Sequence, residues 1–397
     1  MKIAGIIAEY NPFHAGHALQ IQLLREAGFE AIVAVMSPSV VQRGEAALFP
    51  CDVRVSAALI GGVDLLVSLP APYALCSAEG FAAAGVRVLT ALGVCDTLAF
   101  GMEAESTDFI TQAAYAMRNA AYPQALQQEL AKGLAYAPAV QRALAAFSPE
   151  AAALMREPNN ILAVEYCKAI AAAASPLVPY GIRRVGAAHD ASTADGFIAS
   201  ASAIRTIIAQ KGVQAAAPYL PPAALPIYLT AEKNGDITSK AAFSVALLSR
   251  LRALDAQTLA AVRGTSEGLE NRLFAAVQTA KTADALYAAL KTRRYAHSRL
   301  RRLALDAALG YTKAVNMPVP YVQVLGASAR GISLLKRAKA SATLPFGSSL
   351  ASLARAGENA AIIAAAHAAA EDFTALCLAS PRACGQAFTS AVQMPKL

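Results

Sequence analysis

Two histidines three positions apart stand near the N-terminus of the sequence, between a segment typical of a strand and a segment typical of a helix. An apolar run at residues 2–8 precedes His14, Gly16 and His17, and a helical pattern at residues 18–25 follows them. A helix N-terminus offers unpaired N–H groups and a positive dipole end, which suit phosphate. Gly16 would let a phosphate approach the backbone closely, and imidazoles one turn apart can donate to the same phosphoryl group.

A surface pair or a zinc pair is the alternative interpretation of the two histidines. No cysteine pair or acidic third ligand stands nearby in the sequence at metal spacing, which disfavours zinc. The position between a strand and a helix favours a nucleotide site with both histidines at a phosphate.

The segment Ser200-Ala201-Ser202-Ala203-Ile204-Arg205 opens another helical pattern, far from the histidines in the sequence. Ser200 or Ser202 is expected to be its N-cap. A hydroxyl, helix N–H groups and Arg205 could together hold the terminal phosphates of a nucleotide. Alone, the segment is an ordinary capped helix, and its pairing with the histidines makes it a candidate site.

Strands and helices are expected to alternate along the first part of the chain. Continuous apolar runs predict strands at residues 3–8, 31–36, 65–69, 97–100 and 178–182. Helical patterns are expected at residues 18–27, 53–60, 78–92 and 107–119. This alternation predicts an α/β fold with a doubly wound, Rossmann-like parallel sheet and helical insertions. Ligands of such sheets bind beyond the carboxyl ends of the strands.

Loops at those strand ends carry further candidates for nucleotide contacts. Gly101 would let adenine or ribose lie against the backbone. Arg43 could meet a phosphate or a carboxylate, and Arg184 is the better nucleotide candidate of two adjacent arginines. Asn159 or Asn160 could cap a helix or contact the nucleotide. An ordinary turn or cap is the alternative in each case.

Length and composition indicate a globular, helix-rich protein of more than one domain. The chain has 397 residues, of which 56% are hydrophobic, and six cysteines without a CxxC pair, which predicts reduced thiols and a cytoplasmic location. No signal peptide is evident, and the longest apolar run, residues 360–370, is too short to cross a bilayer. We expect a nucleotidyltransferase-like domain at 1–217, a Pro-rich linker at 218–230 and a mainly α-helical, basic domain at 231–397.

A run of positive charge lies in the expected C-terminal domain of this chain, whose formal net charge is +8. It consists of Lys291, Arg293, Arg294, Arg299, Arg301 and Arg302, and Tyr295 and His297 are interleaved with them. Charges of one sign fit binding to an RNA backbone, and Tyr295 could stack on a base; a solvated helix face is the alternative. The patch could be extended by Arg330, Lys336, Arg337 and Lys339. Since a separate domain is expected to carry the run, nucleotide chemistry should not depend on it.

Taken together, the motifs resemble those of bacterial tRNA(Met) cytidine acetate ligases, a family of the HxGH nucleotidyltransferase superfamily. The resemblance covers nearly the whole chain and is carried by residues 8–17, 42–45, 100–103, 158–162, 200–205, 294–300 and 320–326. The chain departs from the family at Pro38, where a glycine is usual, and in Pro50-Cys51-Asp52-Val53, where a Lys-Trp pair is typical. The departures concern this loop and leave His14, His17 and Arg205 unaffected.

The resemblance implies an enzyme that joins acetate to ATP, forming acetyl-adenylate and pyrophosphate. The acetyl group would then pass to N4 of the wobble cytidine of elongator tRNA(Met), with Mg²⁺ as the ATP counter-ion and no dedicated protein cage for it. His14, His17 and Arg205 would be catalytic. The implied ATP-binding residues are Ile7, Glu9, Tyr10, Asn11, Pro12, Phe13, His14, Gly16, His17, Gln20, Gly101, Asn159, Asn160, Arg184, Ser200, Ser202 and Arg205.

Two alternative functions fit part of the sequence. A nucleotidyltransferase that makes a dinucleotide cofactor or a nucleotide-activated small molecule would explain the histidines and the serine–arginine segment, but not the basic run. A non-catalytic RNA-binding protein with a vestigial ATP site would explain the run and the departures at Pro38 and Cys51.

Overall fold

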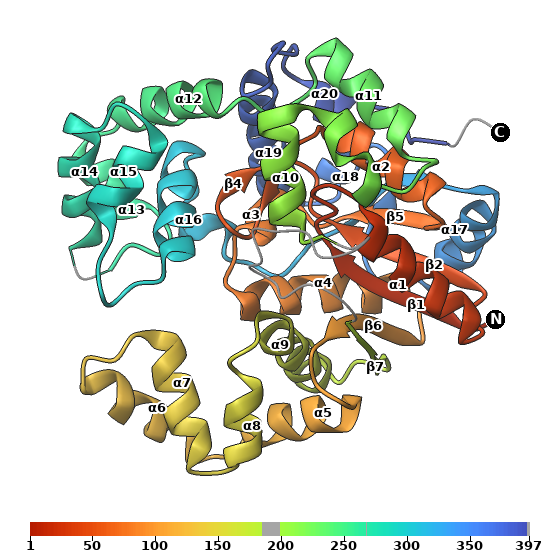
Figure 1. Ribbon diagram of the computed structural model, residues 1–397, viewed down its shortest axis with the longest axis horizontal. Coiled ribbons are helices and arrows are strands. Elements are labelled where there is room, and N and C mark those ends of the chain that lie inside the picture. The colour runs from red at the N-terminus through yellow and green to blue at the C-terminus, as the bar shows by residue number, and fades with distance from the viewer. Residues whose placement is uncertain (185–198, 267, 395–397) are drawn as a thin grey trace.

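A seven-stranded, mostly parallel sheet forms the centre of the protein, in the order β7-β6-β1-β2-β5-β8-β9 (Figure 1). The structure is a computed structural model that describes residues 1–184, 199–266 and 268–394. The strands are β1 (Ile3–Ala8), β2 (Ala31–Met36), β5 (Leu65–Ser68), β6 (Thr97–Met102), β7 (Val178–Arg183), β8 (Val322–Ala327) and β9 (Phe346–Gly347). β7, β6, β1, β2 and β5 run parallel, so the predicted doubly wound sheet is confirmed.

The C-terminal part of the chain completes this sheet. β8 pairs antiparallel with β5, and β9 pairs parallel with β8. The segment between β2 and β5 forms a separate small ribbon of β3 (Val40–Val41) and β4 (Glu45–Ala46). The residues expected to form a separate helical domain therefore also supply two strands of the central sheet.

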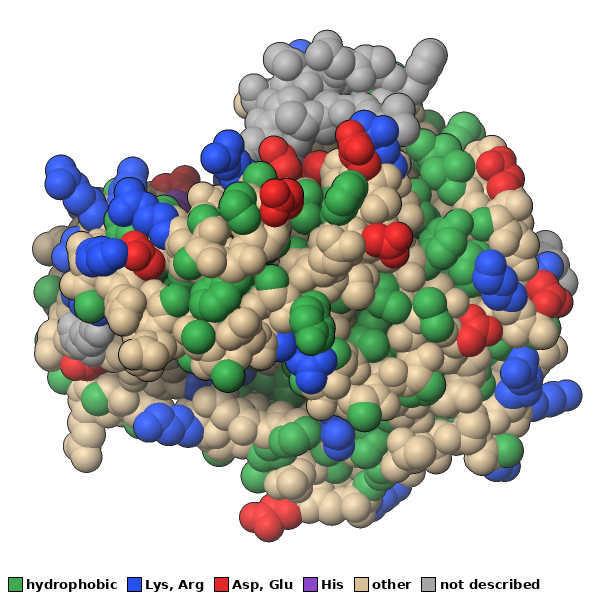
Figure 2. Space-filling model, turned by 90° about the horizontal axis from the view of Figure 1, so that it is seen from below, with side chains coloured by type: hydrophobic (Ala, Val, Ile, Leu, Met, Phe, Trp, Pro, Cys, Tyr) green, Lys and Arg blue, Asp and Glu red, His purple; other side chains and the backbone are tan. Residues whose placement is uncertain are grey.

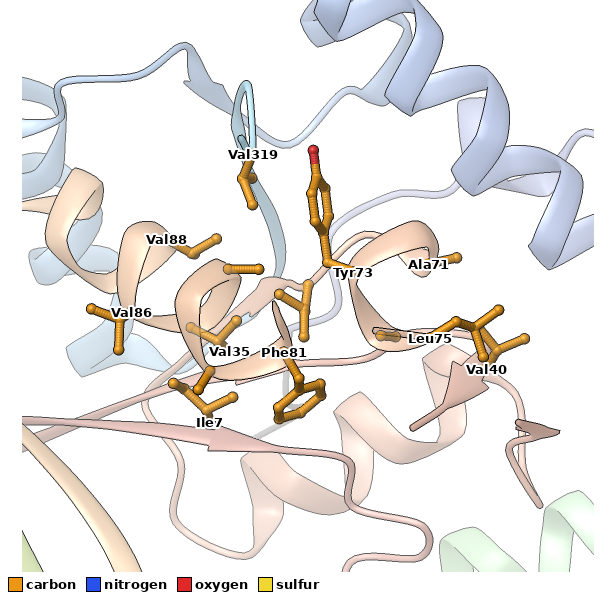
Figure 3. Packing of buried hydrophobic residues seen from close by; sticks show 14 of the residues in the cluster. Ile7, Val35, Val40, Ala71, Tyr73, Leu75, Phe81, Val86, Val88 and Val319 are labelled. Atoms are coloured by element: carbon orange, nitrogen blue, oxygen red, sulfur yellow. The ribbon is translucent and has the colours of Figure 1, made fainter. Parts of the chain in front are cut away.

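Both faces of the sheet are covered by helices, because successive strand residues point to opposite sides. One face packs against α1 (Ala15–Glu26), α2 (Cys51–Ile60), α10 (Ala201–Lys211) and α11 (Leu225–Asn234). The other packs against α3 (Ala71–Ala74), α4 (Ala78–Leu92) and α9 (Pro158–Ala172). Figure 3 shows this second face, where Phe81 of α4 lies over Ile7 and Val35 of β1 and β2.

Two further groups of helices extend from the sheet, the first below it and the second to its left in Figure 1. The insertion between β6 and α9 contains α5 (Thr107–Ala116), α6 (Tyr122–Ala131), α7 (Tyr136–Ala145) and α8 (Pro149–Leu154). The second group comprises α12 (Lys240–Arg252), α13 (Ala256–Ala261), α14 (Leu269–Thr279), α15 (Ala283–Leu290) and α16 (His297–Ala308). The remaining helices are η1 (Val213–Tyr219), η2 (Lys313–Val315), α17 (Ala329–Ser341), α18 (Leu350–Ala354), α19 (Glu358–Leu376) and α20 (Gln386–Thr389).

The expected linker at residues 218–230 is packed against the sheet domain. Most of it lies in η1 and α11. The Tyr228 side chain of α11 is fully buried, and its hydroxyl donates to the Phe13 carbonyl at 3.0 Å. This segment therefore supports the histidine loop through the contact of Tyr228 with Phe13. Among the helices of the described residues, none has both the length and the hydropathy needed to cross a membrane.

Candidate active site

A cleft of about 790 Å³ opens at the carboxyl ends of β1, β6 and β7, within the size range of small-molecule sites. Most of the residues predicted to bind nucleotide line it: Ile7, Glu9, Tyr10, Asn11, His14, Gly16, His17, Gln20, Gly101, Asn159, Arg184, Ser200 and Arg205. Arg43 lines it as well. The fold therefore brings the two main motifs, which are far apart in the sequence, to one cleft.

Four of the predicted nucleotide-binding residues, Pro12, Phe13, Asn160 and Ser202, do not line the cleft. Phe13 is fully buried, and Ser202 is exposed on α10. The Asn160 side-chain oxygen accepts hydrogen bonds from the backbone N–H groups of Glu103 and Ala104, at 2.9 and 3.0 Å, so it braces the loop after β6.

Asn159 and Ser200 have separate structural roles at the edge of the cleft. The Asn159 amide donates to the Glu103 carboxylate. The Ser200 hydroxyl accepts from the Ala203 N–H at 3.1 Å, so Ser200 and not Ser202 is the N-cap of α10.

The two histidines cap α1 through their own side chains. His14 Nδ1 accepts from the Gly16 N–H at 3.0 Å, and His17 Nδ1 accepts from the His14 N–H at 3.3 Å. Their ring centroids are 3.9 Å apart. Because of these caps, α1 begins at Ala15, three residues before the predicted start of the helix.

Burial decides the protonation state of these rings. It lowers the pKa of His14 to about 3 and the pKa of His17 well below its usual value, with smaller contributions from Arg184 beside both. A neutral ring whose Nδ1 accepts a hydrogen bond carries its proton on Nε2. Both histidines are therefore neutral Nε2–H donors, and neither Nε2 has a hydrogen-bond partner among the described residues. Two donors on one cleft wall suit a phosphoryl group.

Tyr10 holds the ring of His17 from the side. Its ring centroid lies 4.9 Å from that of His17 and 5.1 Å from that of Phe13, both in edge-on arrangements. Its backbone φ is 45°, which costs a non-glycine residue roughly 1–3 kcal/mol and persists only where the surroundings enforce it. The loop therefore has one enforced conformation around the two histidines.

Arg54 is a residue of this site that the sequence did not point to. It is fully buried on α2, and its guanidinium donates to the backbone carbonyls of Glu9, Ser37, Pro38 and Phe49. It thus joins the loop after β1 to the loop after β2, including the unusual Pro38. A cation within an amphipathic helix pattern normally points to solvent, so no local signal marks it.

The residues that depart from the family pattern do not line the cleft. Pro38, Cys51 and Asp52 line a separate cavity of about 200 Å³. Asp52 pairs there with Arg382 at 3.0 Å. Arg54 connects Pro38 to the loop of the histidine motif, but the departing residues and the two histidines line different cavities.

Arg205 and Arg184 bring positive charge to the cleft. Arg205 donates to the Asn11 carbonyl at 2.9 Å, so it touches the histidine loop directly. Burial lowers its pKa, although Glu45 and Glu9 act in the opposite direction. Gly101 lies under Arg184: a Cβ at this glycine would be 3.4 Å from Arg184 Cγ. Both cations are placed to meet an anionic ligand.

The N-terminal end of α16 forms another wall of the cleft. His297, Ser298, Arg301 and Arg302 line it together with the histidine loop. Arg301 forms an ion pair with Glu45, and Arg302 Nη1 donates to the Gln42 carbonyl at 3.0 Å. The Gln42 N–H in turn donates to the Glu9 carboxylate at 2.6 Å.

The basic run is therefore divided between two environments. Lys291, Arg293 and Arg294 are exposed, whereas Arg301 and Arg302 turn toward the cleft. Arg299 donates to the Ser266 hydroxyl and lies over the Tyr295 ring. Figure 2 shows Lys and Arg side chains gathered at the left end of the molecule, the end that holds α13 to α16 in Figure 1.

The expectation that four cations further along the chain extend this patch is wrong. Arg330, Lys336, Arg337 and Lys339 belong to α17, which lies at the opposite end of the molecule from α16 (Figure 1). Arg330 pairs there with Asp64 of the sheet domain at 3.8 Å. The chain passes through β8, a strand of the central sheet, between α16 and α17, so the two helices are close in sequence but far apart in the structure.

Gly44 allows α16 to approach this closely. Its φ is +76°, and a Cβ there would lie 2.6 Å from the Arg302 backbone nitrogen. We expect Gly44→Ala to cost about 1–2 kcal/mol for the left-handed backbone and roughly 1–3 kcal/mol more for the clash. Gly133→Ala is the matched control, since its φ is +80° and nothing lies within 4 Å of the added Cβ. Urea unfolding measures both, and equal losses of stability would contradict close packing of α16 on this loop.

Among the described residues, no group of three or more His, Cys, Asp or Glu side chains could hold a metal ion.

The class of the protein follows from this cleft and from comparison with known proteins. A family model described as HIGH nucleotidyl transferase matches residues 1–383. A protein of Caldanaerobacter subterraneus subsp. tengcongensis, named tRNA(Met) cytidine acetate ligase, is 34% identical over 355 residues, which cover 87% of this chain and 88% of that protein. The protein of that name from Listeria welshimeri is 36% identical over 352 residues, covering 87% and 88%.

Solved structures agree with these relatives. Thermotoga maritima TmcAL bound with alpha-thio ATP has a TM-score of 0.92 at 27% identity, and the match covers 100% of both chains. The apo form of that protein has a TM-score of 0.93, also at 27% identity with complete coverage of both chains. The chain belongs to the tRNA(Met) cytidine acetate ligase family of HIGH nucleotidyl transferases.

Proposed function

We propose that this protein is an ATP-dependent ligase that acetylates N4 of the wobble cytidine of elongator tRNA(Met), with acetyl-adenylate as the intermediate. The observation that carries the proposal is the cleft in which two neutral Nε2–H donors at a helix N-terminus face Arg184 and Arg205. Relatives that are 34% and 36% identical to this chain over 355 and 352 residues bear the name of this activity.

In the first step, a carboxylate oxygen of acetate attacks the α-phosphorus of ATP, and pyrophosphate leaves from the opposite side. Negative charge grows on the phosphoryl oxygens, so catalysis depends mainly on positioning and on donors aimed at that charge. We assign His14 and His17 to the α-phosphate oxygens. Arg205 and the N-terminal N–H groups of α10, capped by Ser200, would hold the leaving phosphates.

Mg²⁺ enters this scheme as part of the substrate. Bound to the phosphates of ATP, it would neutralise part of their charge. The cations of the cleft wall, Arg184 and Arg205, would share that task from the protein side.

In the second step, the exocyclic amine of the cytidine attacks the acetyl carbonyl carbon, and AMP leaves. A tRNA is a polyanion much larger than the cleft, so a surface outside the cleft has to hold it. The exposed Lys291, Arg293 and Arg294, with Tyr295 beside them, lie before the α16 wall of the cleft and would supply phosphate contacts and stacking.

The decisive experiment is mass analysis of tRNA nucleosides after incubation of the purified protein with ATP, Mg²⁺ and acetate. We expect N4-acetylcytidine in elongator tRNA(Met), and none when acetate, ATP or the wobble cytidine is left out. Absence of this nucleoside from the complete reaction, with the tRNA bound and the protein folded, would contradict the proposal.

The same reaction separates the two rival functions. A product that retains AMP, is stable in water and forms without tRNA would favour a nucleotidyltransferase acting on a small molecule. Tight tRNA binding without any acetate-dependent ATP turnover would favour a non-catalytic RNA-binding protein.

A further inference from the structure

The acetyl-transfer step needs a proton acceptor, and the assignments above do not supply one. The exocyclic amine of cytosine is a weak nucleophile, because its lone pair is delocalised into the ring. When it forms the N–C bond to the acetyl group, it must lose a proton, and a positioned base typically accelerates such a step by ~10²–10⁴-fold.

His14 and His17 cannot be this acceptor in their observed state. Each uses Nδ1 to accept a backbone N–H and carries its proton on Nε2, so both rings can only donate into the cleft. Among the described lining residues, the other side chains that could accept a proton near neutral pH are Glu9 and His297.

Glu9 already has a structural task. Its Oε1 accepts the Gln42 N–H at 2.6 Å, the link that ties the histidine loop to the loop under α16. Its carboxylate also faces Arg205, Arg43 and Arg54. A proton on Glu9 would weaken both sets of contacts, so the chemistry would loosen the site that performs it.

His297 has the opposite properties. It is the first residue of α16, its ring is exposed in the cleft, and neither ring nitrogen has a hydrogen-bond partner among the described residues. Its only ring contact there is edge-on with Tyr287, at 6.0 Å between centroids. The ring is therefore free to meet a substrate.

The position of His297 is set by α16, which is anchored to the loops at the edge of the cleft. Arg302 ties α16 to Gln42, and Gln42 ties that loop to Glu9 at the end of β1. His297 also directly follows the exposed cations proposed to hold tRNA. It stands on the α16 wall of the cleft that His14 and His17 also line, beside the proposed tRNA surface.

We infer that His297 is the general base of acetyl transfer, which takes the proton from the attacking amine of the acceptor nucleotide. The N4–carbon bond forms, the bond between the acetyl carbon and the phosphate oxygen breaks, AMP leaves with the electron pair, and the proton moves to a His297 ring nitrogen and then to water. This inference rests on the proposed function and adds a catalytic residue to its second step.

The charges around His297 favour its neutral form. Partial removal from water, then Arg301 and Lys291, lower its pKa below the usual 6.5, whereas Glu45 and Asp284 oppose them. Since only the neutral ring accepts a proton, the rate of transfer should fall as the pH drops through this lowered pKa, and should be level above it.

The test is single-turnover transfer to saturating tRNA from pre-formed, enzyme-bound acetyl-adenylate, measured across pH 4.5 to 8 for wild type, His297→Ala and His297→Gln. We expect both variants to slow transfer by ~10²-fold or more and to lose the acidic decline of the wild-type profile. ATP–pyrophosphate exchange should be affected much less, and the glutamine variant guards against a folding defect of the alanine variant.

Transfer at the wild-type rate, or an acidic decline that persists in both variants, would overturn the inference. A decline that disappears in Glu9→Gln but not in the His297 variants would also overturn it and assign the base to Glu9. A wild-type protein that forms no acetylated tRNA at all would instead contradict the proposed function, so the two failures are distinguishable.

Discussion

Replacing His17 by asparagine should lower acetate-dependent ATP–pyrophosphate exchange by ~10²–10³-fold, whereas replacing it by glutamine should preserve much more of the activity. The asparagine amide occupies the position of Nδ1 and can still accept the His14 N–H, but it offers no donor where Nε2 was. The glutamine amide reaches the Nε2 position, but it cannot cap the loop in the same way. The pair therefore separates a donor at the phosphate from a cap of α1.

Exchange of labelled pyrophosphate into ATP, in the presence of acetate and without tRNA, measures this effect. Far-ultraviolet circular dichroism and thermal unfolding serve as controls for the fold. If the asparagine variant kept full exchange, His17 would be only a structural cap. If glutamine were as damaging as asparagine, the Nε2 proton would not be the group that matters.

Reversal of the exposed cations, Lys291, Arg293 and Arg294, to glutamate should cause a large loss of tRNA affinity. Each lost phosphate contact should reduce the slope of log affinity against log salt by about 0.7–0.9. Exchange of pyrophosphate without tRNA should continue, because these three side chains do not line the cleft. Titration of labelled tRNA(Met) at several salt concentrations, beside the exchange assay, measures both quantities.

Arg302→Ala provides the contrasting variant. Arg302 belongs to the same basic run, but it holds the Gln42 carbonyl and lines the cleft. We expect this change to reduce exchange as well as acetylation of tRNA, since the loop that carries Gln42 would lose one of its two anchors on α16 and keep only the Arg301–Glu45 ion pair. Unchanged tRNA affinity in the triple reversal would indicate that the exposed part of the run is only a solvated helix face. Unchanged exchange in Arg302→Ala would show that α16 and the nucleotide cleft are independent.

The central strands could be predicted from the sequence because each is buried on both faces. β1 and β2 begin and end at the predicted residues, since a short, continuous apolar run between helical patterns is typical of a parallel strand that is covered on both faces. The start of α1 was less accurate, because the histidines cap it through side-chain contacts that no helix pattern contains.

The contacts that complete the cleft could not be predicted from local patterns. Arg54 appears as one more residue of a helix, yet four backbone carbonyls converge on its guanidinium. The contact of Arg302 with Gln42 joins residues 260 positions apart, and nothing in either segment marks the other. Residue types and spacing thus indicated the phosphate chemistry, whereas the wall of the cleft that α16 forms depends on tertiary packing.

The pairing of β8 with β5 affects how this chain can be synthesised and divided. Until Val322 to Ala327 have left the ribosome, β5 has no strand paired on its outer side and forms an open edge of the sheet. Unpaired edges of this kind can pair with strands of other chains. The nascent chain therefore carries an unfinished sheet through most of its translation, which makes it a natural client for chaperones. A fragment that ends before β8 should aggregate when expressed alone, whatever its active-site residues, and co-expression with the missing segment should restore solubility.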